Sequence, residues 1–321
     1  MTLTQTDNKL DLIVRLLGPV QVIQGGQPLT ILNTKGLALL VYLAEESSEP
    51  QARSLLANLL WPDQAESAAL HNLRQTLTTL RRTILDHQAQ PPFLFITRQS
   101  LQLNRQSNIW LDTVQFARRQ IYTHPPLTQE SVAALEQAVE LYRGDFLTGL
   151  TIGDSDVFEN WLVTRREYYR RSTTEILDQL ATYYEAQHAY EQSIKFARRL
   201  VELAPWQESA HRTIMRNLAA SGHRGEALAY YQTCCQILEA ELEVEPSFET
   251  TTLFEQIRAG EWPTDSLESR ATLVLNRKVW RETTHHLPAH LTSFVGREPE
   301  LAKLADYLAK PTCRLITIGG P

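Results

Sequence analysis

The stretch ESAALHNLRQTLTTLRRTIL, residues 66–85, decides how the N-terminal part of this chain folds. Its leucines recur with the 3.6-residue period of an amphipathic helix, which predicts one apolar stripe packed against a core. That stripe consists of Leu70, Leu73, Leu77, Leu80 and Ile84. The opposite face carries amides, hydroxyls, a histidine and an arginine, where a merely solvated helix more often carries Glu and Lys. Such side chains suit the base edges of a DNA major groove; they are His71, Asn72, Gln75, Thr78, Thr79 and Arg82.

The residues around this helix predict a small sheet before it and a β-hairpin after it. Short apolar runs separated by Gly18-Pro19 and Gly25-Gly26 predict antiparallel strands, because glycine suits the positive φ of tight turns. Asn33 or Thr34 is the expected cap of a first helix, and a second helix follows Pro50. The expected ranges are 12–17, 20–23 and 28–32 for strands, 34–44 and 51–60 for helices, and 93–97 with 101–104 for the hairpin.

This order of elements predicts a winged helix-turn-helix domain of the α+β type over residues 1–108. The third helix of such a domain enters the major groove, and the hairpin, or wing, touches the DNA backbone. The candidate DNA-binding residues are His71, Asn72, Arg74, Gln75, Thr78, Thr79 and Arg82 on the helix, with Arg98 and Arg105 on the hairpin. The alternative is a small helical domain whose polar face is only solvated.

The charge of this region permits contact with nucleic acid although the whole chain is acidic. The formal net charge is −6. Residues 66–105, however, hold five arginines against Glu66 and Asp86, a local excess of three positive charges. An excess of this kind is what a phosphate-binding surface needs.

Residues 109–262 show a helical repeat. Ser193 and Ala227 lie 34 residues apart, and the residues around them correspond as well. Paired helices with a 34-residue period and small residues at their crossing are typical of tetratricopeptide repeats, whose concave surface serves mostly for binding. The aromatic residues of this region are interpreted as packing between repeats rather than as a ligand cage. The fold class expected for the chain is therefore multi-domain and mainly α, with an all-α repeat domain after the winged helix.

Composition argues for a cytoplasmic protein without a metal site. No signal peptide precedes Leu10, and the longest apolar run, residues 36–44, is far short of the roughly 20 residues that a membrane span needs. Three cysteines, Cys234, Cys235 and Cys313, have no metal-binding spacing. No catalytic triad or acid–base pair is apparent, so the chain is not expected to be an enzyme.

Five stretches, taken together and in order, resemble bacterial transcriptional activators of the antibiotic-regulatory-protein (SARP) type. They are LGPV at 17–20, LLW at 59–61, NLRQ at 72–75 with LRR at 80–82, LYRGDFL at 141–147 and GHRGEALAYY at 222–231. These activators join an OmpR-like winged helix to a tetratricopeptide-like bacterial transcriptional activator domain. The resemblance covers about residues 10–262.

The resemblance implies double-stranded promoter DNA as a partner, usually bound at direct repeats on which the protein self-associates. It also implies recruitment of RNA polymerase subunits and no membrane partner. The groove-facing helix carries His71, Thr78 and Thr79, positions at which family members vary, so the family does not supply the target sequence.

The tail predicts a linker over residues 263–290 and the edge of a P-loop NTPase domain over 291–321. Val295, Gly296 and Arg297 resemble the entry to signal-transduction ATPases of the STAND or NB-ARC type, and Gly319 and Gly320 resemble the start of a P-loop. The sequence ends before the Lys and Ser/Thr of that loop, so this nucleotide site is incomplete. No cofactor is expected for the chain, and ATP with Mg²⁺ only for a longer parent protein.

Two other functions compete with that of a DNA-binding activator. One is a signal-transduction ATPase whose NTPase domain lies beyond this sequence. The other is a repeat-based scaffold whose winged helix binds protein. The polar face of residues 71–82 favours the activator, because a protein-binding or solvated face would be richer in Glu.

Overall fold

Four strands from two distant parts of the chain form the N-terminal sheet of the computed structural model, which describes residues 11–123 and 127–261. The strands are β1 (Leu12–Arg15), β2 (Gln21–Gln24), β3 (Gln27–Pro28) and β7 (Ile109–Leu111). Their order is β3-β2-β1-β7, with β1–β2 and β2–β3 antiparallel. Gly25 and Gly26 make the turn from β2 to β3 with φ of 55° and 77°, which glycine adopts at little cost. β7 runs parallel to β1, so the sheet takes its last strand from beyond residue 108.

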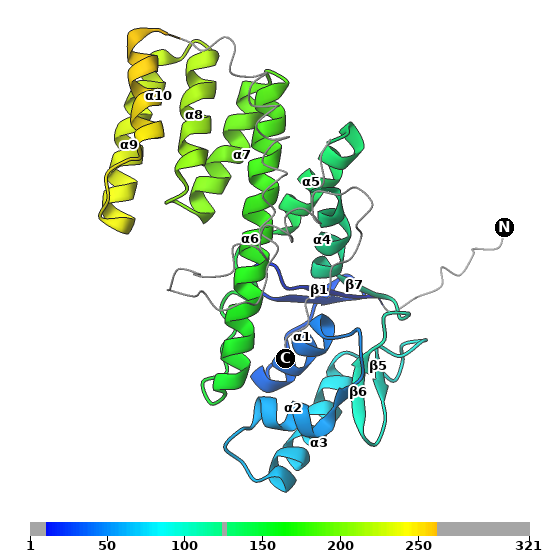
Figure 1. Ribbon diagram of the computed structural model, residues 1–321. Helices are drawn as coiled ribbons and strands as arrows, with labels where there is room; N and C mark the ends of the chain where they lie inside the picture. Colours follow the sequence, from blue (N-terminus) through cyan, green and yellow to red (C-terminus); the bar gives the residue numbers. More distant parts are fainter. Residues whose placement is uncertain (1–10, 124–126, 262–321) are drawn as a thin grey trace, which may run out of the picture. The chain divides into compact units, whose positions relative to one another are not determined.

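Three helices lie below this sheet in Figure 1 and pack on one another: α1 (Thr34–Glu45), α2 (Arg53–Leu60) and α3 (Glu66–Thr83). The Asn33 side chain caps α1 by accepting the Gly36 N–H at 3.1 Å. The stripe expected to be core on α3 is core: Leu73, Leu77 and Leu80 are buried, as is Ile84 just after the helix, and Leu70 is partly buried. The helical period of residues 66–85 therefore placed the apolar face correctly.

The β5–β6 hairpin follows α3 and pairs with a short strand from before α2, giving a three-stranded sheet in the order β4-β6-β5. Its strands are β4 (Gln51–Ala52), β5 (Leu94–Ile96) and β6 (Ser100–Leu103). Residues 51 and 52 were expected to be helical, but Gln51 pairs with Leu101 and Ala52 with Ser100. The backbone of these two residues pairs with the N–H and C=O groups at the free edge of β6. The helix α2 therefore begins only at Arg53.

The rest of the described chain is helical. It comprises α4 (Asp112–Gln120), the short 3₁₀ turn Ile121–Thr123, α5 (Gln129–Leu141), α6 (Asp156–Ala186), α7 (Tyr190–Leu203), α8 (Glu208–Ala220), α9 (Arg224–Leu242) and α10 (Phe248–Ala259). The helices from α7 to α10 pack side by side in sequence order (Figure 1). Ser193 and Ala227, the small residues 34 apart, are both fully buried, which is why neighbouring helices can approach there. The predicted fold class is confirmed: mainly helical, with a small sheet-containing N-terminal region followed by a repeat-like helical region.

The predicted linker and NTPase edge, residues 263–321, lie outside the described residues, as do Val295, Gly296, Arg297, Gly319 and Gly320.

A buried carboxylate joins the N-terminal sheet to the helical region. Asp112, the first residue of α4, accepts the backbone N–H groups of Leu16 and Leu17 at 2.8 and 3.0 Å. Both leucines are fully buried, so these N–H groups have no access to water. Burial raises the pKa of the Asp112 carboxyl, while the backbone N–H groups and Arg143 oppose the shift. The carboxylate thus supplies the hydrogen-bond acceptor for two buried N–H groups of the loop that follows β1.

Residues 142–148, which we call the strap, pair with the same loop through two isolated bridges, Leu17–Phe146 (antiparallel) and Pro19–Thr148 (parallel). The Arg143 N–H donates to the Leu17 carbonyl at 3.0 Å, and the Leu147 N–H donates to the Leu16 carbonyl at 2.8 Å. The two backbones touch at Gly18, where an added Cβ would lie 3.1 Å from the Arg143 Cβ. LGPV and LYRGDFL, two of the stretches that carry the family resemblance, are therefore packed directly on one another.

The first half of α6 completes this junction against α1. The Tyr169 hydroxyl donates to the Glu45 carboxylate at 2.8 Å, and the Trp161 indole N–H donates to Glu46 at 3.0 Å. Arg165 forms an ion pair with the same Glu46. Phe146 of the strap stacks on the Tyr169 ring, with centroids 5.2 Å apart. Apolar and polar contacts together make the two regions one compact unit.

Replacing Asp112 by Ala should destabilise the protein by about 2–6 kcal/mol, because two buried N–H groups lose their acceptor at roughly 1–3 kcal/mol each. Asp112→Asn keeps one acceptor oxygen and should cost less. Urea unfolding measures both. Asp154→Ala, which removes an exposed ion pair with Lys35, is the control and should cost under about 1 kcal/mol. Equal effects of Asp112→Ala and Asp154→Ala would contradict the role given to Asp112.

Gly18→Ala should cost about 1–3 kcal/mol, since Gly18 has φ of 122° and the new Cβ would press on Arg143. Gly153→Ala is the matched control: it has no neighbour within 4 Å and should be nearly neutral. The free energy of unfolding of both variants, measured in parallel, decides the point. A neutral Gly18→Ala would mean that the strap and the loop are not tightly packed.

Candidate nucleic-acid interface

The exposed face of α3 carries most of the predicted DNA-binding side chains. At about 100° per residue, His71, Gln75, Thr78 and Arg82 fall within a stripe about 60° wide. All four are exposed, and Arg74 and Thr79, which flank the stripe, are exposed as well. The buried Leu73, Leu77 and Leu80 hold the opposite side of the helix against α1 and α2. One rigid helix therefore presents amide, hydroxyl, imidazole and guanidinium groups together.

Several of these side chains are held by short-range hydrogen bonds. His71 and Gln75, one turn apart, lie 2.8 Å from each other. The Thr78 hydroxyl donates to the Arg74 carbonyl at 2.8 Å. Asn72 is only partly exposed, and its amide donates to Gln64 in the turn between α2 and α3 at 2.6 Å. Asn72 thus fixes the turn that precedes the helix, while the others remain able to meet a ligand.

Arg82 and Arg98 are exposed and have no hydrogen-bond or ion-pair partner among the residues that the structure describes. Arg98 sits at the hairpin tip, where the Thr97 hydroxyl accepts the Gln99 and Ser100 N–H groups at 3.2 and 2.9 Å. These hydrogen bonds close the turn, so Arg98 lies on a turn that is held by the Thr97 side chain. Two guanidinium groups on α3 and the hairpin are consequently available for phosphate or base contact.

Arg105, the second hairpin arginine, is tied back to the protein. Its Nε donates to the buried Ser47 hydroxyl at 2.6 Å, and that hydroxyl donates to the Ala44 carbonyl near the end of α1. Arg105 therefore anchors the exit of the hairpin to α1 through one nitrogen. Arg81 is likewise engaged, in an ion pair with the buried Asp86 at 2.8 Å.

Arg53 is a residue of this surface that the sequence reasoning missed. It opens α2, and its Nε donates to the Thr97 carbonyl in the hairpin turn at 3.1 Å. Burial lowers its pKa, and the nearby Arg74 of α3 adds to the shift. Cations from α2 and α3 thus come together beside the hairpin turn. The sequence does contain one signal for Arg53. A cation in the first turn of a helix is unfavourable beside the helix dipole, which suggests that Arg53 is kept there for a contact outside α2.

Neither a metal-binding cluster of side chains nor a membrane-spanning helix is found in the described part of the chain. No group of three or more His, Cys, Asp or Glu there could hold a metal ion. Within the same residues, no helix is both long and apolar enough to span a bilayer.

The N-terminal region has three helices and a hairpin that pairs with β4, and a stack of helices follows it. This arrangement defines the class of protein: a small sheet-containing module fused to a helical-repeat domain. Residues 108–258 match the family model of the bacterial transcriptional activator domain. This match and the fold confirm the resemblance to SARP-type bacterial transcriptional activators.

The structure of Mycobacterium tuberculosis EmbR in complex with a low-affinity phosphopeptide is similar, with a TM-score of 0.62 and 20% sequence identity. The match covers 84% of this chain and 71% of that one. At this identity the likeness shows a shared fold. No curated protein sequence matches the chain.

Proposed function

We propose that this protein is a sequence-specific DNA-binding transcriptional activator of the SARP type. The domain match supports the activator role, and the exposed polar stripe of α3 carries the DNA-binding role. In this proposal α3 enters the major groove of promoter DNA. His71, Gln75, Thr78, Thr79 and Arg82 meet base edges or flanking phosphates there.

Arginines around the stripe supply the sequence-independent part of binding. Arg74, Arg98 and Arg53 come from three different elements and lie beside or beyond the stripe. Contacts of guanidinium groups to phosphates position a protein on the duplex and release counterions, so they set affinity and its salt dependence. Asn72 and Arg105, with their bonds to Gln64 and Ser47, support this surface more than they read sequence.

The helical region is proposed to contact RNA polymerase subunits and to support self-association on direct repeats in the cytoplasm. Exposed apolar side chains near the turn from α9 to α10 favour a protein partner: Val244 is 44% exposed and Phe248 is 83% exposed. The junction at Asp112 and the strap holds this region firmly to the winged helix. No catalytic role is assigned to the described residues.

The direct test is selection of binding sites from a random DNA library by the full chain. Recovery of one motif, present as direct repeats, is the expected result. Enrichment of no sequence, together with capture of a protein partner by the winged helix, would favour the scaffold alternative instead.

Arg82→Ala should weaken binding to the selected DNA. A lost bidentate contact to a base would cost roughly 1–3 kcal/mol and relax preference at one position, whereas a lost phosphate contact would weaken all sequences alike. Competition binding across single-base variants of the site separates the two cases. Arg171→Ala, on the exposed side of α6, is the control. Unchanged binding of Arg82→Ala to every sequence would remove α3 from the interface.

Arg98→Ala should make the salt dependence of binding shallower. Log affinity falls with log salt by about 0.9 per neutralised phosphate, so losing one contact should reduce the slope by about one unit. Arg53→Ala should do the same if Arg53, beside the hairpin turn, also meets phosphate. Titrations at several salt concentrations measure the slope, and one identical to that of the unmodified protein would contradict the role of the hairpin.

A further inference from the structure

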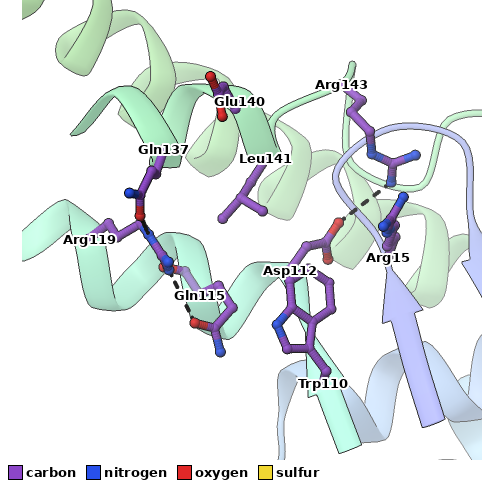
Figure 2. Close-up of a pocket in the computed structure, with 9 residues that line it drawn as sticks. All are labelled: Arg15, Trp110, Asp112, Gln115, Arg119, Gln137, Glu140, Leu141 and Arg143. Atoms are coloured by element: carbon purple, nitrogen blue, oxygen red, sulfur yellow. Dashed lines mark hydrogen bonds and ion pairs between the residues drawn. The ribbon is translucent and has the colours of Figure 1, made fainter. Parts of the chain in front are cut away.

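A pocket at the junction has no role in the proposed DNA contacts. It lies between β1, β7, α4 and α5 and has a volume of about 390 Å³, within the range of small-molecule sites. Arg15 and Arg143 line one side and Arg119 the other, with Trp110 and Leu141 between them (Figure 2). The lining therefore combines three guanidinium groups with a flat aromatic ring.

The positive charge around this pocket is poorly matched by acids. The one hydrogen-bond partner of the Arg15 side chain in the described chain is the Gln21 amide oxygen, at 3.4 Å. Among the described residues, Arg119 donates only to neutral oxygens of Gln115 and Gln137, at 2.9–3.1 Å. Guanidinium groups prefer carboxylate or phosphate partners, which they can bind through two parallel hydrogen bonds. Both groups thus retain donors for an anion.

The two acids that line the pocket do not supply that anion. Asp112 lies 3.6 Å from Arg143, but its oxygens already accept the N–H groups of Leu16 and Leu17. Glu140 is exposed and has no ion-pair partner among the described residues. Three cations therefore face one engaged and one solvated carboxylate.

We propose that this pocket binds a small aromatic or heteroaromatic carboxylate. Arg15 on one side of the pocket or Arg119 on the other would pair with the carboxylate, and the half-buried Trp110 ring and Leu141 would cover the flat face of the ligand. The volume suits a molecule of one or two rings. Asp112 and Arg143, which hold the loop after β1, border the same space, so the ligand would stabilise the junction by mass action.

The test uses the full chain and three probes: benzoate, nicotinate and indole-3-carboxylate. Ligand-observed NMR should detect binding of at least one, and that probe should raise Tm. Benzamide, which has the shape of benzoate without its charge, should bind at least about tenfold more weakly. Absence of binding by all three carboxylates would overturn the proposal, as would equal binding of benzamide and benzoate.

Two variants locate the site. Arg119→Gln or Arg15→Gln, whichever removes the guanidinium group on the side of the carboxylate, should weaken its binding about tenfold, the loss expected for one charge-assisted hydrogen bond. Arg118→Gln is the matched control, because Arg118 is exposed on the same helix and does not line the pocket. Far-ultraviolet circular dichroism checks that each variant is folded. If folded Arg119→Gln and Arg15→Gln bind as tightly as Arg118→Gln does, the anion lies elsewhere and the proposal fails.

Discussion

The fold of the described residues depends on the hydrogen bonds that the Asp112 carboxylate accepts from the loop after β1. A buried backbone N–H without an acceptor is costly, and here two consecutive ones, at Leu16 and Leu17, have a single side chain as acceptor. Once that loop is held, the strap pairs with it, and Gly18 lets the two backbones approach. The helical region therefore begins from a fixed point on the N-terminal sheet.

This junction has a mechanical consequence for an activator. α6 contacts α1 through Tyr169, Trp161 and Arg165 and then continues into the repeat-like stack. Since α1 also packs against α3, the proposed DNA-binding helix and the proposed polymerase-contacting region are joined through packed helices rather than through a flexible linker. A small molecule in the pocket beside Asp112 would act on the same connection.

The sequence allowed much of the candidate interface to be predicted, because helical periodicity assigns faces without knowledge of the fold. The apolar stripe of α3 was placed correctly, and six of its seven candidate contact residues are exposed. Asn72 and Arg105 illustrate the limit: each has a hydrogen-bond partner, Gln64 or Ser47, that is remote in sequence or in another element. Arg53 was missed for the same reason, since only folding brings it to Thr97 and Arg74.

The sequence by itself determined local features: the period of the helix over residues 66–85, the glycine turn at residues 25–26, and the 34-residue spacing of Ser193 and Ala227. Such features depend on neighbours within a few turns or on a repeated pattern. Only the tertiary structure decided that β7 joins the first sheet, that residues 51–52 form a strand, and that LGPV packs on LYRGDFL. Those pairings join residues far apart in the chain, and no local preference specifies which buried N–H will meet which distant acceptor.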